Sequence, residues 1–509
     1  MTMATAEMGR RRFLALAAGG AVTLSGVAAV GAAEPSARDD PWQAAIEEAR
    51  TRQPWLAGYD SAPLAGYGPL TLPLPKGWPT FLTGTLYRNG PALHTFGGTR
   101  YHHWFDGDGM VQRFHIADGH LTFTSRYVRT EKLTREITAG RRLWPTFDSA
   151  INGPALTHSD ALNPANISVL WHNRRLFALW EAGSPHELDP KTLVTSGRVA
   201  WDGDSHLPFT AHPKIDASGA LWGIGYANIG LNRLILYHLD RHGQPRQRRI
   251  LAVPQMPPVH DFVLTEDFLV IPLPPFTFER AADGAAYLDH HRWDGQRPTR
   301  ILIVNRADFT QTRMVEGAPW WAFHYGGGWQ DRDGTIHLLA ITYPDTAILS
   351  GPLRVLMRGK ESRRRSTDGM PTRVSIDRGG RVTTWPIGAA GVEFPSGVTP
   401  GNSRFRQTFM LTGAAEKRPQ FTGVGRVDPD RGVLDNFHFD GKVAVEEHLF
   451  IPGPAGGWLI GVILDLARRK TVLTLFKAAD LAAGPVAQVP LPMALPLGLH
   501  GTWVAHPKG

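Results

Sequence analysis

Short apolar segments alternate with turns rich in Asp and Gly along the chain beyond residue 60. Alternating apolar positions on either side of such turns predict tight antiparallel β-hairpins. The five clearest units span residues 215–226, 239–251, 331–341, 375–385 and 427–437. The segment PWQAAIEEAR at 41–50 has apolar residues at helical spacing instead, and we expect a short helix there.

The hairpin pattern runs from about residue 60 almost to the last residue, and no long helical period interrupts it. Antiparallel hairpins repeated over such a length favour a β-propeller, in which circular repetition protects the sheet edges. The repeat is irregular, so the number of blades cannot be read from its period. We therefore expect an all-β protein with residues 34–509 in a single propeller domain.

The composition agrees with many short strands, because the 509 residues include 55 Gly, 40 Pro, 16 Trp and 23 Phe. The chain has no Cys, which excludes disulfides, thiolate nucleophiles and Cys-held metals. Any metal must be bound by His, Asp or Glu. The 21 His residues make such a site possible.

The sequence supports neither nucleic-acid binding nor phosphate binding by a glycine-rich loop. The net charge is +8, but no basic segment is combined with a nucleic-acid-binding motif. The densest basic segment, residues 358–365, is interpreted as a solvated loop, with an acidic partner as the alternative. The Gly-rich segment FHYGGGWQD at 323–331 has no lysine followed by a helix, so it is not a phosphate-binding loop.

Residues 1–33 have the features of an export signal. GRRRFL at 9–14 fits the twin-arginine pattern, an Ala/Gly-rich apolar segment follows, and small residues precede Glu34. We expect export by the twin-arginine route to the periplasm or the exterior. A retained membrane anchor is the alternative.

Three histidines each begin a strand–turn–strand unit, and a fourth lies near the end of the chain; they are His212, His260, His324 and His500. Equivalent positions on different blades of a propeller converge at the central axis. Four imidazoles there would form an all-nitrogen site suited to a metal such as Fe(II). With 21 histidines in the chain, spacing alone also allows coincidence.

Several longer segments resemble the carotenoid cleavage oxygenase family, in family order and over about residues 80–506. The matching segments are GTLYRNGPA (84–92), HWFDGDGMV (103–111), YVRTEK (127–132), the stretch 163–193, FTAHPKID (209–216), HDFVLT (260–265) and LHGTW (499–503). The resemblance implies a seven-bladed propeller with short helical caps over the iron-bearing face. It assigns Fe(2+) to the four histidines named above.

The resemblance also implies an activity. It predicts a dioxygenase that cleaves a C=C bond of a carotenoid or apocarotenoid with O2 and gives carbonyl products, with no catalytic residue beyond the metal ligands. A stilbene- or phenylpropene-cleaving dioxygenase on the same scaffold is one alternative. A non-catalytic propeller that binds an apolar or phenolic ligand is another.

In this family, glutamates hold three of the four histidines. Local matching places Glu181 and Glu447 in two of these positions, with an exposed Glu447 and an inward Glu446 as the alternative. The third position follows the third histidine by six residues in the family pattern H-x-x-N-A-x-E. This chain has Gln330 there, and we expect Gln330 to accept a hydrogen bond from His324.

Two residues are candidates for substrate binding. Tyr101 and Lys132 lie at places similar to those that hold the phenol in hydroxystilbene-cleaving members. The alternative is a rim tyrosine and a solvated lysine. Apolar residues 272–278 and 347–357 could line a tunnel mouth that contacts a membrane, or form ordinary loop and core.

Overall fold

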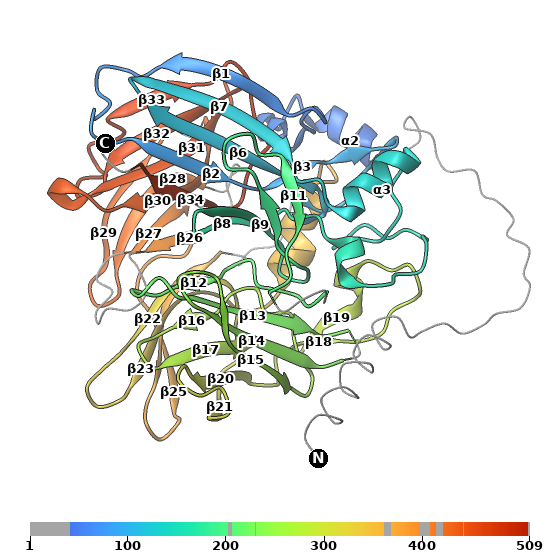
Figure 1. The fold of residues 1–509 in the computed structure, drawn as a ribbon, viewed down its shortest axis with the longest axis vertical. Helices are drawn as coiled ribbons and strands as arrows, with labels where there is room; N and C mark the ends of the chain where they lie inside the picture. The colour runs from blue at the N-terminus through green and yellow to red at the C-terminus, as the bar shows by residue number, and fades with distance from the viewer. Residues whose placement is uncertain are drawn as a thin grey trace, which may run out of the picture.

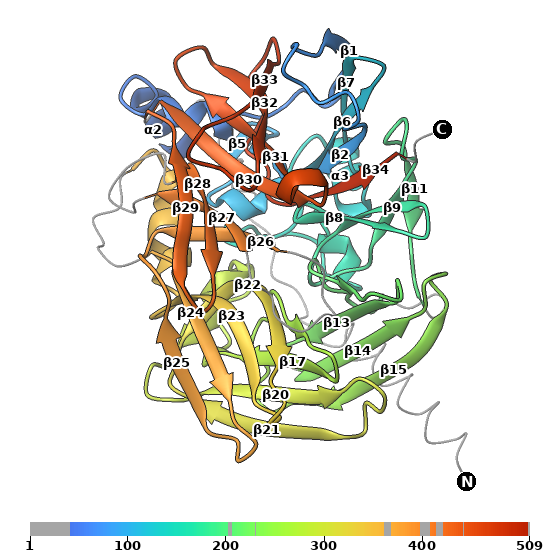
Figure 2. The same ribbon diagram turned by 90° about the vertical axis from the view of Figure 1, so that its left-hand side faces the viewer.

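Seven β-sheets follow one another along the chain as the blades of a propeller (Figures 1 and 2). The computed structural model describes residues 41–201, 206–229, 231–360, 368–397, 408–413, 421–440 and 442–506. The predicted export signal at 1–33 lies outside the described residues. The prediction of an all-β, seven-bladed propeller is confirmed.

Blade 1 contains strands from both ends of the chain, in the order β1-β7-β6-β2-β34 with β3 beside β6. The other blades have four strands each: β8–β11, β12–β15, β16-β17-β20-β21, β22–β25, β26–β29 and β30–β33, numbered 2 to 7. The strands of blades 1 to 3 are β1 Tyr67–Pro73, β2 Gly84–Arg88, β3 Pro91–Leu93, β6 Asp108–Ala117, β7 His120–Tyr127, β34 Gly501–Ala505, β8 Ser168–His172, β9 Arg175–Leu179, β10 His186–Leu188, β11 Thr195–Arg198, β12 Lys214–Ile215, β13 Leu221–Ala227, β14 Arg233–Leu239 and β15 Pro245–Ala252.

The strands of blades 4 to 7 are β16 Val263–Leu264, β17 Phe268–Leu273, β20 Thr299–Asn305, β21 Thr312–Gly317, β22 Trp321–Gln330, β23 Ile336–Tyr343, β24 Met370–Ile376, β25 Val382–Pro386, β26 Val392–Gly397, β27 Thr408–Gly413, β28 Phe421–Asp428, β29 Gly432–His438, β30 Val443–Ile451, β31 Trp458–Asp465, β32 Lys470–Lys477 and β33 Ala487–Pro490. Two small hairpins stand apart from the blades: β4 Thr95–Phe96 with β5 Thr99–Arg100, and β18 Phe276–Phe278 with β19 His291–Trp293.

The ring is closed by an antiparallel pair between an early strand and a late one. Strand β2 pairs with β34, with Leu86 opposite Trp503 and Gly84 opposite Ala505, and the two lie side by side in Figure 1. Backbone hydrogen bonds therefore join the two ends, β2 is paired on both edges, and β34 becomes the inner strand of blade 1.

All five predicted hairpins form, joining β12 to β13, β14 to β15, β22 to β23, β24 to β25 and β28 to β29. The turn between β12 and β13 shows how an Asp/Gly sequence forms such a hairpin. The Asp216 carboxylate accepts hydrogen bonds from the backbone N–H groups of Ser218 and Ala220. Gly219 has a φ of 82°, a conformation that glycine adopts without strain.

The apolar core lies between neighbouring blades. Ile224 and Leu236 of blade 3 pack with Leu269 and Ile271 of blade 4 in one buried cluster. Val270 and Ile303 belong to the next cluster, which blade 4 shares with blade 5. Alternate residues of β17 thus face opposite blades, as the two-residue period of a strand requires.

The helical segments of the described residues are α2 Pro41–Ala49, α3 Glu131–Ala139, α4 Arg354–Leu356, the 3-10 turns η1 Pro54–Tyr59, η2 Trp104–Asp106, η3 Ser159–Leu162, η4 Tyr287–His290 and η6 Pro454–Gly456, and the π-turn η5 Leu349–Leu353. The helices α2 and α3 lie at one side of the propeller, to the right in Figure 1, whereas η6 lies in the loop between β30 and β31. Helix α2 was predicted. Helix α3 was not, although Thr130 caps its first turn and Gly140 ends it at a φ of 67°.

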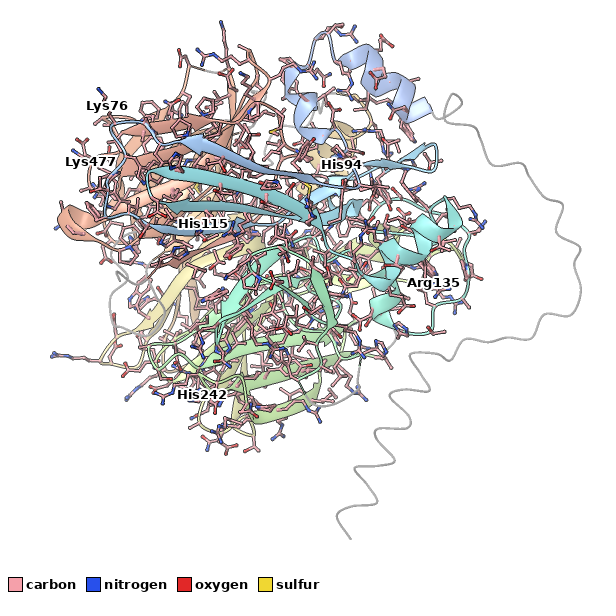
Figure 3. All side chains as sticks on the ribbon, turned by 45° about the horizontal axis from the view of Figure 1, so that its top comes forward. Lys76, His94, His115, Arg135, His242 and Lys477 are labelled. Carbon is pink, nitrogen blue, oxygen red and sulfur yellow. The ribbon has the colours of Figure 1, made fainter. Side chains whose placement is uncertain are left out.

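Figure 3 labels polar side chains both at the surface and in the interior. Lys76, Arg135, His242 and Lys477 are exposed, whereas His94 is fully buried (Figure 3). The helices of the described residues are all too short or too polar to cross a membrane.

Candidate metal centre

The four predicted histidines converge on one point. His212, His260 and His500 stand just before β12, β16 and β34, and His324 lies within β22. They therefore come from blades 3, 4, 5 and 1. Their Nε2 atoms lie 3.0 Å apart between His212 and His260, 3.3 Å between His260 and His324, and 3.0 Å between His324 and His500.

These nitrogen spacings fit a shared metal ion. A metal–imidazole bond of about 2.1 Å places two ligand nitrogens at right angles about 3.0 Å apart. The side-chain ligand atoms of all four histidines lie within 4.8 Å of one another. Four imidazoles that present the same ring nitrogen to one point form a donor set that suits a divalent transition metal.

An irregular strand carries His324 at the centre. The register of β22 with β23 shifts between Ala322 and Gly327, on either side of His324. Gly328 allows the close approach of blade 4, because a Cβ there would lie 2.4 Å from Val263. Bulges of this kind redirect a side chain at the cost of regular pairing.

Three glutamates, of which Glu393 and Glu447 are buried, accept hydrogen bonds from the outer nitrogens of three histidines. The Nδ1–H of His260 donates to Glu181; that of His324 donates to Glu393 at 2.5 Å. His500 Nδ1–H donates to Oε1 of Glu447 at 2.8 Å. Such bonds fix the ring orientation and leave Nε2 free to act as a ligand.

Each glutamate is held in turn by further donors. Tyr226 Oη–H donates to Glu181 at 2.6 Å, and Tyr343 Oη–H donates to Glu393 at 3.0 Å. The backbone N–H of Gly501 donates to Glu447 at 2.7 Å. The orientation of the carboxylates is therefore set by groups beyond the histidines.

The environment favours neutral imidazoles at two of the four positions. Burial and the neighbouring imidazoles hold the pKa of His212 and of His324 well below the usual value. Burial also lowers the pKa of His260, but the Glu181 carboxylate outweighs it and raises that pKa overall. Burial raises the pKa of Glu393 to about 7. A cation at the centre of the four rings would compensate buried carboxylates, which are costly when unpaired.

Comparisons with known proteins identify the family. The profile described as "Retinal pigment epithelial membrane protein" (RPE65) matches residues 68–505. The chain belongs to this family. Its members include the carotenoid cleavage oxygenases, so the predicted resemblance is confirmed.

Curated relatives cover nearly the whole chain. An isoeugenol monooxygenase of Pseudomonas nitroreducens is 27% identical over 460 residues, which are 84% of this chain and 93% of the relative. An apocarotenoid-15,15'-oxygenase of Synechocystis is 28% identical over 497 residues, 91% of this chain and 98% of the relative. A resveratrol cleavage oxygenase of Aspergillus fumigatus is 26% identical over 477 residues, 84% of this chain and 90% of the relative.

Solved structures agree with this family. The Synechocystis apocarotenoid oxygenase, in a cobalt-substituted form, matches with a TM-score of 0.77 and 25% identity, covering 89% of this chain and 98% of that one. A point variant of the same oxygenase gives the same values. The neighbouring structure thus has a metal centre that accepts cobalt.

The expectation for Gln330 is wrong. Gln330 Oε1 accepts hydrogen bonds from Thr265 Oγ1 and from the backbone N–H of Asp267, both at 2.9 Å. It lies at the far end of β22 from His324, and six residues of extended strand span about 20 Å. The third glutamate that holds a histidine is Glu393 on blade 6, which accepts from His324 and was not among the predicted residues.

The other two glutamates lie as expected from the family. Glu181 follows β9 and contacts His260, and Glu447 contacts His500 from β30. The alternative of an exposed Glu447 is wrong, because the side chains of Glu446 and Glu447 are both buried. The register of β30 with β31 shifts between Val445 and His448, so the two acids sit in a bulge.

Tyr101 and Lys132 lie together, but in a closed cluster. Lys132 Nζ donates to Tyr101 Oη at 3.0 Å, to Asp108 at 3.0 Å and to Glu136 at 2.8 Å. Both Tyr101 and Lys132 are 0% exposed. Neither offers surface that a substrate could touch, so the structure does not support a phenol-binding role for the pair.

Proposed function

We propose that the protein is a non-haem Fe(II) dioxygenase that cleaves a C=C bond of a carotenoid or apocarotenoid with O2 and gives carbonyl products. The observation that carries the proposal is the set of four Nε2 atoms at metal-ligand spacing, on four rings of which three are held by glutamates. Membership of a family that contains named carotenoid and apocarotenoid oxygenases supports the reaction class.

Bound iron would supply the activation of O2 for insertion into the double bond. His212, His260, His324 and His500 would hold it, and the four imidazoles add no charge. Glu181, Glu393 and Glu447 keep three of these rings fixed by accepting their Nδ1 protons. The aromatic ring of Phe394 packs 5.5 Å from the His324 ring and 5.1 Å from the His500 ring and gives this side of the centre an apolar neighbour.

A second candidate function keeps the fold and the metal but changes the substrate. Relatives named isoeugenol monooxygenase and resveratrol cleavage oxygenase match over most of this chain. They favour a stilbene or phenylpropene as the alternative to a carotenoid.

One set of measurements tests the proposal. Purified protein is analysed for metal, loaded with Fe(II), and assayed for O2 uptake with an apocarotenal, a hydroxystilbene and a phenylpropene. Product masses after 18O2 labelling show whether one or two oxygen atoms enter. Uptake with the apocarotenal and two labelled carbonyl products are expected. Absence of uptake with all three substrates would contradict an oxygenase and favour a ligand-binding propeller.

We also propose that residues 1–33 direct export by the twin-arginine route. The Arg10–Arg11 pair and the following apolar, Ala/Gly-rich segment support this. A reporter fused behind residues 1–40 should reach the periplasm, and replacing both arginines with lysine should retain it in the cytoplasm. Export that is unaffected by the double replacement would contradict the proposed route.

A further inference from the structure

An apolar cavity lies beside the metal centre, beneath the helical segments. Its empty volume is about 640 Å³, part of it open to solvent. Segments η1, η2 and η5 form one wall, and strands of blades 6 and 7 form the other. Apolar side chains dominate the lining, among them Trp55, Trp104, Leu411 and Phe421. A cavity of this character suits an apolar ligand with few polar groups.

The cavity adjoins two of the four histidines through two side chains of its lining. Phe394 lines the cavity and packs against the rings of both His324 and His500. Glu447, which holds His500, also lines it. A ligand that fills the cavity therefore lies next to the proposed iron site.

Glu446 and Glu447, the two carboxylates in the lining, differ in how many of their oxygens accept hydrogen bonds. Both oxygens of Glu447 accept hydrogen bonds, Oε1 from His500 and Oε2 from the backbone N–H of Gly501. Glu446 accepts two hydrogen bonds on Oε2 alone, from Arg88 Nη1 at 3.0 Å and from the Gly498 N–H at 2.5 Å. Within the part of the chain that the structure describes, no group donates to Glu446 Oε1.

The structure holds Glu446 firmly in this position. Glu446 is 5% exposed and its partner Arg88 is 1% exposed, so their ion pair is shielded from solvent. A Cβ on Gly498 would lie 3.3 Å from the guanidinium of Arg88. Glu446 lines an apolar cavity, and its Oε1 has no donor among the described residues, so it lacks the hydrogen bonds that it would make in water. A ligand that brings a donor of its own would supply one.

We propose that Glu446 determines substrate specificity by accepting a hydrogen bond from a hydroxyl group on the terminal ring of an otherwise apolar alkene. The inference rests on the proposed function and names the substrate class within it. A phenol and a hydroxylated terpenoid ring share this chemistry. The hydroxyl end would bind at Glu446 while the apolar chain extends past Phe394 toward the histidines.

Matched substrate pairs test this directly. The first pair is 4-hydroxystilbene and 4-methoxystilbene; the second is a 3-hydroxy-apocarotenal and its 3-deoxy form. Hydrogen bonds to a charged group correspond to a preference of about 10- to 100-fold, so we expect the wild type to prefer one hydroxylated member by this factor in kcat/KM. The pair that shows the preference distinguishes a phenolic from a terpenoid substrate.

Glu446→Gln should bring the ratio of the two kcat/KM values close to one, because the amide has the shape of the carboxylate but not its charge. Glu187→Gln is the matched control, since Glu187 pairs with Arg175 outside the cavity lining. If Glu446→Gln does not fold, the double variant Arg88→Gln/Glu446→Gln removes the unpaired charge as well. A preference that survives either folded variant overturns the proposal, and so does a wild type without preference in both pairs.

A binding experiment separates this proposal from the proposed function. Saturated 4-hydroxybibenzyl and 4-methoxybibenzyl cannot be cleaved, and their binding is measured by quenching of tryptophan fluorescence, to which Trp55 and Trp104 of the lining contribute. Selective binding of the hydroxylated form without turnover of any alkene would refute the proposed function and keep the role of Glu446. Equal affinity for the two bibenzyls, together with no preference in the apocarotenal pair, would overturn that role.

Discussion

Glu393 accepts the Nδ1 proton of His324 at 2.5 Å, although 69 residues separate the two and they belong to different blades. Tyr343 donates to the other oxygen of the same carboxylate. The contact joins blade 5 to blade 6 at the edge of the candidate metal centre. It also corrects the expectation that Gln330, on the same strand as His324, would serve this purpose.

Replacing Glu393 with Gln should weaken metal binding. Loss of a carboxylate behind a ligand imidazole lowers metal affinity or activity by about 10- to 100-fold. Gln330→Ala is the matched control and should leave metal affinity unchanged, because Gln330 contacts Thr265 and Asp267 instead. Metal titration and O2 uptake check both variants. Equal loss in the two would contradict the assignment of Glu393.

Removing the metal should lower thermal stability. The four ligands come from blades 1, 3, 4 and 5, so an ion that binds them binds the folded ring and not the unfolded chain. At a free concentration of 100 times Kd, the gain is about 2.7 kcal/mol. Chelation followed by addition of Fe(II) or Co(II) should lower and then restore the Tm. His212→Ala should remove the response to added metal, and an unchanged response would contradict a role for His212.

Lys132→Met should strongly destabilise the fold. Lys132 is the cation between the carboxylates of Asp108 and Glu136. Removing one partner of a buried ion pair costs about 3–5 kcal/mol. Tyr101→Phe removes one hydrogen bond from the same cluster and should cost only about 1 kcal/mol. Urea denaturation measures both. A stable Lys132→Met that loses only activity toward phenols would instead support the phenol-binding hypothesis.

Acid should destabilise the protein through its buried neutral histidines. Burial lowers the pKa of His94 to about 3 and that of His103 to about 4. Both groups bind a proton in the unfolded chain below about pH 6.5 but not in the folded one. Their contribution to stability is therefore complete above pH 6.5 and is lost as the pH falls toward 4. Each group adds a slope of about 1.4 kcal/mol per pH unit.

The opposite shift occurs at Asp108 and Asp148, where burial raises both pKa values to about 6. Their contribution is present at low pH and is lost as the pH rises through 6, so it partly offsets the histidines. The variant His94→Leu isolates one group. The free energy of unfolding of this variant, measured between pH 4 and 6, should fall less steeply with acid than that of the wild type. An unchanged slope would show that His94 is protonated in the folded state.

The sequence predicted those features that repeat or that lie within one segment. The hairpins were found because Asp–Gly turns and alternating strands are local signals, and the four histidines because each begins such a unit. Glu393 could not be found this way, since nothing in the segment 391–397 points to a histidine on another blade. Helix α3 was missed although its cap at Thr130 and its end at Gly140 are visible in the sequence.

The buried ion pairs are a second feature that could not be predicted from the sequence. Lys132 and Glu446 are residue types that usually lie in solvent, yet their side chains are 0% and 4% exposed. Glu446 pairs with Arg88, which lies 358 residues away along the chain. Lys132 pairs with Asp108 of β6, 24 residues away, besides Glu136 on its own helix. Folding is needed to bring Glu446 to Arg88 and Lys132 to Asp108.

The pairing of β2 with β34 has a consequence for the order of assembly. His500 directly precedes β34, so the fourth imidazole reaches the other three only when the last strand docks onto the first blade. During synthesis, three of the four imidazoles emerge well before the fourth. Metal capture and completion of the ring are thus thermodynamically coupled, and each makes the other more favourable.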